Sequence, residues 1–419
     1  MDLAVLFIIL SAFFTATAQQ IESNVSRGSS LTPITNSKWL SRSGVYAFGF
    51  YKQGNDYAVG IFLAGIDPEL TVVWTANRDG PQLSSNAILL FETDGRLLLQ
   101  ATRGQRIVIA ASIGAASASM LNSGNFVLYN SDQQIIWQSF DYPTDTLLSG
   151  QRLLAGQQLL SSISESDHST GIFRLKMQHD GNLVQYPVNT PDTALYAYYA
   201  SKTGGSGDNV TLNLDADGYY LYLLNGAGYN IRNLTNYGGY TTRETIYLMR
   251  IDADGIFRLY SHNLKQSGNW SIIWSSSDDK CDPKGLCGLN AFCVMNDKKA
   301  VCVCLPGFAV EYSGNWTSGC ARNFIAQSCQ SKDVSNEYTV EELVDTSWED
   351  DSYSVLSSTG KEYCQQNCLE DCNCEAAQYS DRTCRKQRLP LRYGRRKLTD
   401  PSIAFIKLGI TIRDNIIIK

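Results

Sequence analysis

The segment Gln178-His-Asp-Gly-Asn-Leu-Val-Gln-Tyr186 indicates the fold of this 419-residue chain. Its Asp180-Gly181 pair is a turn signal, because glycine tolerates positive φ, and a mostly apolar run follows it. Four further pairs of this kind precede aliphatic or aromatic runs: Asp94-Gly95, Ser123-Gly124, Asp217-Gly218 and Asp254-Gly255. Such repeats usually stack strands around a shared axis, so that each repeat buries what it could not bury alone. We therefore expect a mainly β protein.

Alternate residues of the same segment form a candidate sugar-binding surface. On a single strand, every second side chain points to the same face. The residues that would share this face are Gln178, Asp180, Asn182, Val184 and Tyr186. Their polar groups can bond to ring hydroxyls, while the valine packs on the apolar C–H patch of a sugar. The alternative is that the segment is only a structural strand.

Copies of this pattern elsewhere in the chain keep fewer of the five residue types. One copy, a weaker candidate site, keeps the last three positions: Asn125, Val127 and Tyr129. The copy from Asp252 to Tyr260 keeps two, and the copies that begin at Glu92 and Asp215 keep one each. A single shallow site should bind weakly, because hydroxyl desolvation offsets much of each hydrogen bond.

The N-terminus predicts export. An apolar run from Leu3 to Phe14 is followed by small residues at 15–18, which is typical of a signal peptide covering residues 1–18; an N-terminal membrane anchor is the alternative. Charged residues interrupt the apolar tail at 403–418, so we do not expect that tail to span a membrane. The predicted N-glycosylation sites are Asn24, Asn209, Asn233, Asn269 and Asn315.

All 12 cysteines follow residue 280, which separates two kinds of stabilisation. The first two-thirds must depend on a hydrophobic core, whereas disulfides are expected to hold the last third. A zinc site is the alternative use of clustered cysteines, but export favours oxidation. A basic stretch at 382–397 and an acidic one at 341–351 are either solvated segments or a docking surface for an anionic polysaccharide or a protein.

We assign no catalytic residue, metal site or cofactor from the sequence. The pairs Asp215-x-Asp217 and Asp252-x-Asp254 each stand before glycine, which fits turns better than a calcium loop or a glycosidase carboxylate pair. The three histidines are scattered, without a nearby nucleophile. A net charge of −6 argues against nucleic acid as the partner of the whole chain.

Several motifs point to a known family. The pattern Q-x-D-x-N-x-V-x-Y at 178–186 resembles the mannose-binding signature of bulb-type lectins. Four longer runs resemble the S-domain of plant G-type lectin receptor kinases: Val45–Phe50, Val72–Asp79, Ser123–Tyr129 and Trp137–Leu148. The resemblance implies two tandem bulb-lectin β-prism domains, at 22–149 and 150–276, followed by a disulfide-rich EGF-like module at 277–321 and an α+β PAN/apple module at 329–409.

The resemblance also implies disulfide pairs, although spacing alone permits others. The implied pairs are Cys281–Cys293, Cys287–Cys302, Cys304–Cys320, Cys364–Cys384, Cys368–Cys374 and Cys329–Cys372. A helix is expected at 360–371, with Thr359 and Glu362 as its capping box. The lead-in Asp278-Asp279-Lys280 departs from that of calcium-binding EGF modules, so no calcium is expected.

By resemblance, the function is recognition of a mannose-type glycan or another extracellular ligand at the plant cell surface. Family members are plasma-membrane receptors with this region outside the cell; the chain as given is expected to be secreted. The EGF and PAN modules would support homo- or hetero-dimers. One alternative is a protein- or peptide-binding and dimerisation ectodomain with degenerate sugar sites. Another alternative is a fragment of a full serine/threonine receptor kinase whose kinase domain lies beyond Lys419. The chain as given contains no kinase motif, so we do not expect it to be an enzyme.

Overall fold

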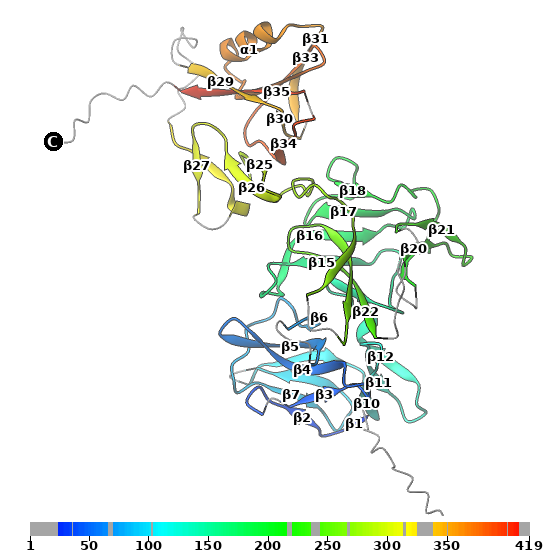
Figure 1. The fold of residues 1–419 in the computed structure, drawn as a ribbon. Coiled ribbons are helices and arrows are strands. Elements are labelled where there is room, and N and C mark those ends of the chain that lie inside the picture. The colour runs from blue at the N-terminus through cyan, green and yellow to red at the C-terminus, as the bar shows by residue number, and fades with distance from the viewer. Residues whose placement is uncertain are drawn as a thin grey trace, which may run out of the picture. The chain divides into compact units, whose positions relative to one another are not determined.

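The computed structural model confirms the mainly β class (Figure 1). It describes residues 24–35, 37–65, 70–101, 104–215, 220–235, 244–265, 269–312, 316–324, 338–349, 351–399 and 401–409. The predicted signal peptide, Asn315, Cys329 and the Asp217-Gly218 turn lie outside these residues. The chain divides into two compact units: the first contains residues up to Lys52, Asp56–Val72 and Gln82–Asp141, and the second contains Gln53–Asn55, Val73–Pro81 and the residues from Tyr142 onward.

The first unit contains three sheets. Their strands, in hydrogen-bonded order, are β1 (Asn24–Ser26), β10 (Ser117–Met120), β11 (Phe126–Tyr129) and β12 (Ile135–Gln138); β2 (Ser30–Leu31), β7 (Ile88–Phe91), β8 (Leu97–Gln100) and β9 (Arg106–Ala110); and β3 (Lys38–Leu40), β4 (Tyr46–Gln53) and β5 (Asp56–Leu63). Strand β6 (Val72–Ala76) begins in this unit and ends in the second, and a 3-10 turn, η2, covers Ser139–Asp141. The core includes Trp39 stacked on Phe126, whose ring centroid is 4.3 Å from that of Phe48.

The second unit repeats this arrangement with three sheets of its own. Their strands are β13 (Thr146–Leu148), β22 (Thr245–Ile251), β23 (Phe257–Asn263) and β24 (Ser271–Ser275); β14 (Arg152–Leu153), β19 (Thr211–Leu214), β20 (Leu221–Leu224) and β21 (Asn230–Asn233); and β15 (Gln158–Ser162), β16 (Thr170–Met177), β17 (Leu183–Pro187) and β18 (Tyr199–Ala200). One core joins them, and Phe173, Leu212 and Phe257 within it are fully buried.

The glycine turns explain the repeat. Gly95, Gly124, Gly181 and Gly255 all have positive φ, between 82° and 95°. In each turn the glycine N–H donates to the carbonyl three residues earlier, at 2.9–3.1 Å. Only glycine adopts this conformation readily, so each turn sets the start of the strand that follows it.

Arg78 attaches the segment Val73–Pro81 to the rest of the second unit. Its guanidinium donates to the carbonyls of Leu160 at 2.7 Å and Ser161 at 2.8 Å, and lies 3.9 Å from the Asp145 carboxylate. Both charged side chains are 8% exposed. This buried pair stabilises the segment only while both partners remain.

The cysteine-rich part of the second unit contains the remaining elements. They are β25 (Ala291–Asn296), β26 (Lys299–Cys304), β27 (Phe308–Val310), η3 (Trp316–Ser318), β28 (Cys320–Arg322), β29 (Tyr338–Val344), β30 (Thr346–Ser347), β31 (Ser352–Ser357), α1 (Lys361–Glu370), β32 (Ala376–Ser380), β33 (Thr383–Gln387), β34 (Gly394–Arg396) and β35 (Ile403–Gly409). Sheet orders are β26-β25-β34-β30, β27-β28 and β29-β35-β32-β33-β31. A Cβ on Gly394 would lie 2.5 Å from the Ala291 carbonyl, so glycine permits the close β25–β34 approach.

Disulfides hold this part of the chain together. The described residues include five: Cys281–Cys293, Cys287–Cys302, Cys304–Cys320, Cys364–Cys384 and Cys368–Cys374. Cys364 and Cys368 lie on α1 and are fully buried. The expected capping box is wrong, because Gly360 is the N-cap and no side-chain cap bond forms. None of the described helices is long and apolar enough to cross a membrane.

Candidate functional site

The segment 178–186 is not one strand, and that expectation is wrong. Strand β16 ends at Met177 and β17 begins at Leu183. Between them the Gln178 N–H donates to the Asn182 carbonyl at 2.9 Å, and the Gly181 N–H donates to the Gln178 carbonyl at 3.1 Å. The Asp-Gly pair is therefore a hairpin turn. Gln178 and Asp180 lie in the turn, Asn182 follows it, and only Val184 and Tyr186 lie on the strand.

The hairpin nevertheless brings these residues together. Gln178 Nε2 donates to Tyr186 Oη at 2.8 Å, and Asp180 Oδ1 accepts from the Asn182 N–H at 3.0 Å. Val184 and Tyr186 share the outer face of β17, whereas Leu183 belongs to the core. Burial raises the pKa of the Tyr186 hydroxyl above its ordinary value.

The two polar residues of the turn differ in how accessible they are. Asp180 is exposed. Asn182 is half-buried, and its Oδ1 accepts from Ser201 Oγ at 3.1 Å and from the Thr203 N–H at 3.2 Å. The Asp180 carboxylate is consequently the acceptor most readily offered to a ligand, while Asn182 holds the turn against the neighbouring segment.

A loop that the sequence pattern did not identify is attached to β16 beside the site. Residues 188–197, which we call the 188–197 loop, follow β17 and carry Asp192. Asp192 lies 2.8 Å from Arg174 Nη2 and 2.6 Å from Lys176 Nζ. On β16, these two cations pair with Tyr186 and Val184.

Arg174 ties the loop to the strand in further ways. It donates to the Thr190 carbonyl at 2.5 Å, and its guanidinium lies 4.9 Å from the centre of the Tyr186 ring. Val184 and Tyr186 are each only 2% exposed. The alternation of Arg174 and Lys176 along the preceding strand is visible in the sequence, but no local signal links Asp192 to them.

In the first unit, the weaker candidate site begins at Asn125, whose side chain is hydrogen-bonded within the protein. Asn125 is 6% exposed; its Nδ2 donates to Gln138 Oε1 at 2.9 Å, and its Oδ1 accepts from Ser139 Oγ at 3.1 Å. Val127 is fully buried, and Tyr129 is half-buried. The Asn125 side chain stabilises η2, so a sugar would have to displace these bonds.

In the copy at 252–260 an arginine occupies the valine position. Arg258 donates to Asp252 at 2.5 Å and to Asp254 at 2.8 Å, and Tyr260 Oη donates to Asp252 at 2.6 Å. A cavity of about 370 Å³ opens beside them, and His168 also lines it. Burial raises the pKa of Asp252 despite these bonds. The carboxylates that would accept sugar hydroxyls are already bonded to Arg258.

Two family models match the chain. The model of the D-mannose binding lectin matches residues 71–164, and that of the S-locus glycoprotein domain matches residues 225–312. The G-type lectin S-receptor-like serine/threonine-protein kinase LECRK3 of Oryza sativa subsp. indica is 30% identical over 95% of this chain and 52% of its own length. The chain belongs to the G-type lectin S-receptor-like family. RLK1 of Arabidopsis thaliana, a kinase of the same description, is 27% identical over 96% of this chain.

This G-type lectin chain spans about half the length of the curated relatives it matches. Solved lectins are similar to a smaller part. A monomeric monocot mannose-binding lectin from Gastrodia elata is 26% identical over 32% of this chain and 96% of its own, with a TM-score of 0.23. The snowdrop (Galanthus nivalis) agglutinin complexed with methyl-α-D-mannoside is 25% identical over 30% of this chain and 96% of its own, with a TM-score of 0.23.

Three other expectations for this G-type lectin chain concern the basic stretch, the glycosylation sites and metal binding. Within the basic stretch, Lys386 is ion-paired with Asp371, and Arg395 lies 3.1 Å from Asp282, which favours the structural alternative. Four predicted glycosylation sites are exposed: Asn24, Asn209, Asn233 and Asn269. Among the residues that the structure describes, no group of three or more His, Cys, Asp or Glu side chains could hold a metal ion.

Proposed function

We propose that this chain is the extracellular, carbohydrate-binding part of a cell-surface receptor kinase, or a soluble form of one, and that it binds mannose-type glycans. The proposed binding residues are Gln178, Asp180, Asn182, Val184 and Tyr186. The observation that carries the proposal is the hairpin that brings Gln178, Tyr186 and the exposed Asp180 together. We also propose the domain boundaries, the glycosylation sites and the Cys329–Cys372 pair expected from the sequence.

We infer from the hairpin geometry how a mannoside would bind. Asp180 would accept from ring hydroxyls, and Gln178 and Tyr186 would share a hydroxyl at the end of the hairpin. Val184 is only 2% exposed, and we infer that a sugar reaches it only if Asp192 leaves Arg174 and Lys176, which would cost free energy. Binding by one site is therefore weak, and clustering of receptors would supply avidity.

A glycan array with the exported chain tests the proposal. We expect mannose-rich glycans to bind, and both Asp180→Ala and Asn182→Ala to abolish that binding. The matched control is Asp94→Ala, in the equivalent turn of the first unit, where the carboxylate bonds to Arg96. Binding that survives both substitutions, or absence of glycan binding, contradicts the proposal.

A second candidate is a protein- or peptide-binding ectodomain that forms homo- or hetero-dimers. The bonds that satisfy Asn125 and Arg258 internally favour it, because two copies of the pattern serve packing instead of ligand binding. Sedimentation equilibrium distinguishes this candidate. Self-association that is indifferent to mannoside and to Asp180→Ala supports it.

A further inference from the structure

Two tyrosine rings lie together at the start of β20 in the second unit. The ring centroids of Tyr220 and Tyr222 are 5.0 Å apart, and both side chains are half-buried. Between and beyond them, Leu221 and Leu223 are fully buried in the core. Because side chains alternate along a strand, the two tyrosines point away from that core. The outer face of β20 therefore presents a pair of aromatic rings.

A predicted glycosylation site lies directly opposite this pair. Asn233 on β21 is exposed and is the cross-strand partner of Tyr222 (Figure 1). Directly opposed residues of an antiparallel pair share a face, with Cβ atoms about 4.5–5.5 Å apart. The next residue, Leu234, packs against the core, which agrees with an outward direction for Asn233. A glycan on Asn233 would therefore begin beside the two rings.

The hydrogen bonds around Asn233 are compatible with a glycan there. Asn233 Oδ1 accepts from Asn230 Nδ2 at 2.6 Å, and this bond uses the amide oxygen, whereas an N-glycan is carried by the amide nitrogen. Thr235, the third residue of the sequon, accepts from the Leu221 N–H through Oγ1 at 2.9 Å. This second bond attaches the end of the sequon to β20 and so fixes its position relative to the tyrosines.

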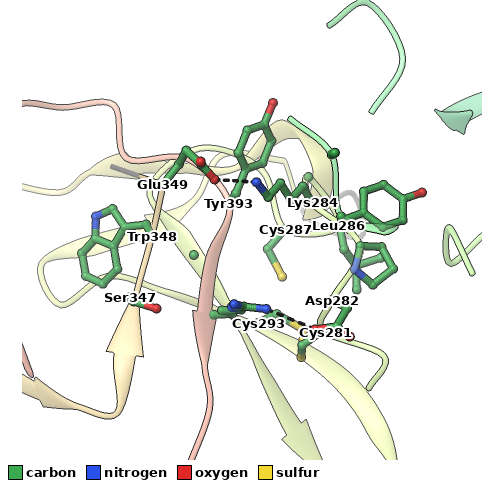
Figure 2. A pocket seen from close by; sticks show the side chains of 16 residues that line it. Cys281, Asp282, Lys284, Leu286, Cys287, Cys293, Ser347, Trp348, Glu349 and Tyr393 are labelled. Carbon is green, nitrogen blue, oxygen red and sulfur yellow. Dashed lines mark hydrogen bonds and ion pairs between the residues drawn. A yellow bond between two sulfur atoms is a disulfide. The ribbon is translucent and has the colours of Figure 1, made fainter. Parts of the chain in front are cut away.

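The cavity shown in Figure 2, of about 360 Å³, indicates no ligand by comparison. It is bordered by two ion pairs, Lys284 with Glu349 at 2.9 Å and Arg395 with Asp282 at 3.1 Å. A ligand that used these charges would first have to break pairs in a partly buried site, which costs free energy. The tyrosine pair on β20 has an identified occupant close at hand, and the cavity does not.

We propose that the Tyr220–Tyr222 pair binds the first N-acetylglucosamine of a glycan attached to Asn233 of the same chain. This inference rests on glycosylation at Asn233 and not on mannose binding at the 178–186 hairpin. The apolar C–H face of the sugar would pack on the rings, while its hydroxyls remain in water. Covalent attachment gives a high effective concentration, so a weak contact suffices. Because β21 is an edge strand, the contact would stabilise an edge of this sheet.

The first test detects the contact directly. The exported chain is trimmed with an endoglycosidase that leaves one N-acetylglucosamine per site, and peptide mass spectrometry establishes whether Asn233 carries it. NMR should then show nuclear Overhauser contacts between this sugar and the ring protons of Tyr222, assigned with Tyr222→Val. An unmodified Asn233, or an attached sugar without ring contacts, overturns the proposal. Ring contacts from added methyl α-D-mannoside, with none from the attached sugar, would assign the pair to external glycans instead.

The second test measures coupling between the sugar and the ring by thermal unfolding. Asn233→Gln should lower the melting temperature by about 2–4 °C more in the wild-type background than in the Tyr222→Val background. The lost bond to Asn230 affects both backgrounds equally and cancels. The matched control is Asn24→Gln, because Asn24 lies opposite Ser119 on a paired strand and should show no coupling to Tyr222. Equal effects of Asn233→Gln in both backgrounds overturn the proposal, and the NMR contacts of the wild type decide it even if a variant fails to fold.

Discussion

Asp192→Ala should open the proposed glycan site. Asp192 pairs with Arg174 and Lys176, and we infer that these pairs hold the 188–197 loop over Val184 and Tyr186. Burial alone would raise the pKa of Asp192, but the hydrogen bond from Lys176 and the charge of Arg174 bring it below its ordinary value. The carboxylate is therefore ionised at neutral pH and can pair with both cations.

The magnitude follows from the two ion pairs. The Asp192 side chain is 33% exposed, so solvent screens both pairs and each contributes about 0.2–1 kcal/mol. Together they stabilise the attached loop by about 0.4–2 kcal/mol, which corresponds to about a 2- to 30-fold change in apparent affinity. Asp192→Ala should tighten methyl α-D-mannoside binding by that factor.

Isothermal titration of the wild type and the variant measures this change. Glu342→Ala is the control, because it removes a comparably exposed partner of an ion pair outside the site. An affinity for mannoside that is unchanged or lower in Asp192→Ala would contradict the inference that the loop covers the site.

Three further predictions concern stability. Arg78→Ala should destabilise the second unit by about 3–5 kcal/mol in denaturant unfolding, because it leaves the buried Asp145 charge without one of its partners; a loss below about 1 kcal/mol contradicts this. Burial would raise the pKa of Asp371, but the hydrogen bond from Lys386 helps to lower it to about 2. Its stabilisation should thus be complete above about pH 4 and lost as the pH falls towards 2, and Asp371→Asn should remove that slope from acid-unfolding curves. Gly255→Ala should lower the free energy of unfolding by about 1–3 kcal/mol, because φ is +82° and the new Cβ would lie 2.7 Å from a buried phenylalanine ring; an unchanged melting temperature would count against it.

The fold class was predictable because its signals are local. The pairs Asp94-Gly95, Asp180-Gly181 and Asp254-Gly255 need only glycine's freedom at positive φ and the strand that follows. The same turn signal should have excluded a continuous strand at 178–186, since one backbone segment cannot both turn at Gly181 and remain extended. That error came from applying the alternation of side chains across a turn.

The details of the candidate site depended on long-range contacts. Asn182 bonds to Ser201 and Thr203, and Arg174 reaches Asp192, through partners that no spacing rule connects. These contacts form only when sheets and loops pack. Arg258 follows Asp252 and Asp254 in the sequence, but its bonds to both carboxylates were not predicted.

Saturation-transfer NMR of methyl α-D-mannoside detects weak binding by a single site. We expect transfer from the wild-type chain to the sugar, its loss in Asp180→Ala, and its retention in Asp94→Ala. Transfer that persists in Asp180→Ala, or its absence from the wild type, would contradict a mannose-binding site at the Gln178–Tyr186 hairpin.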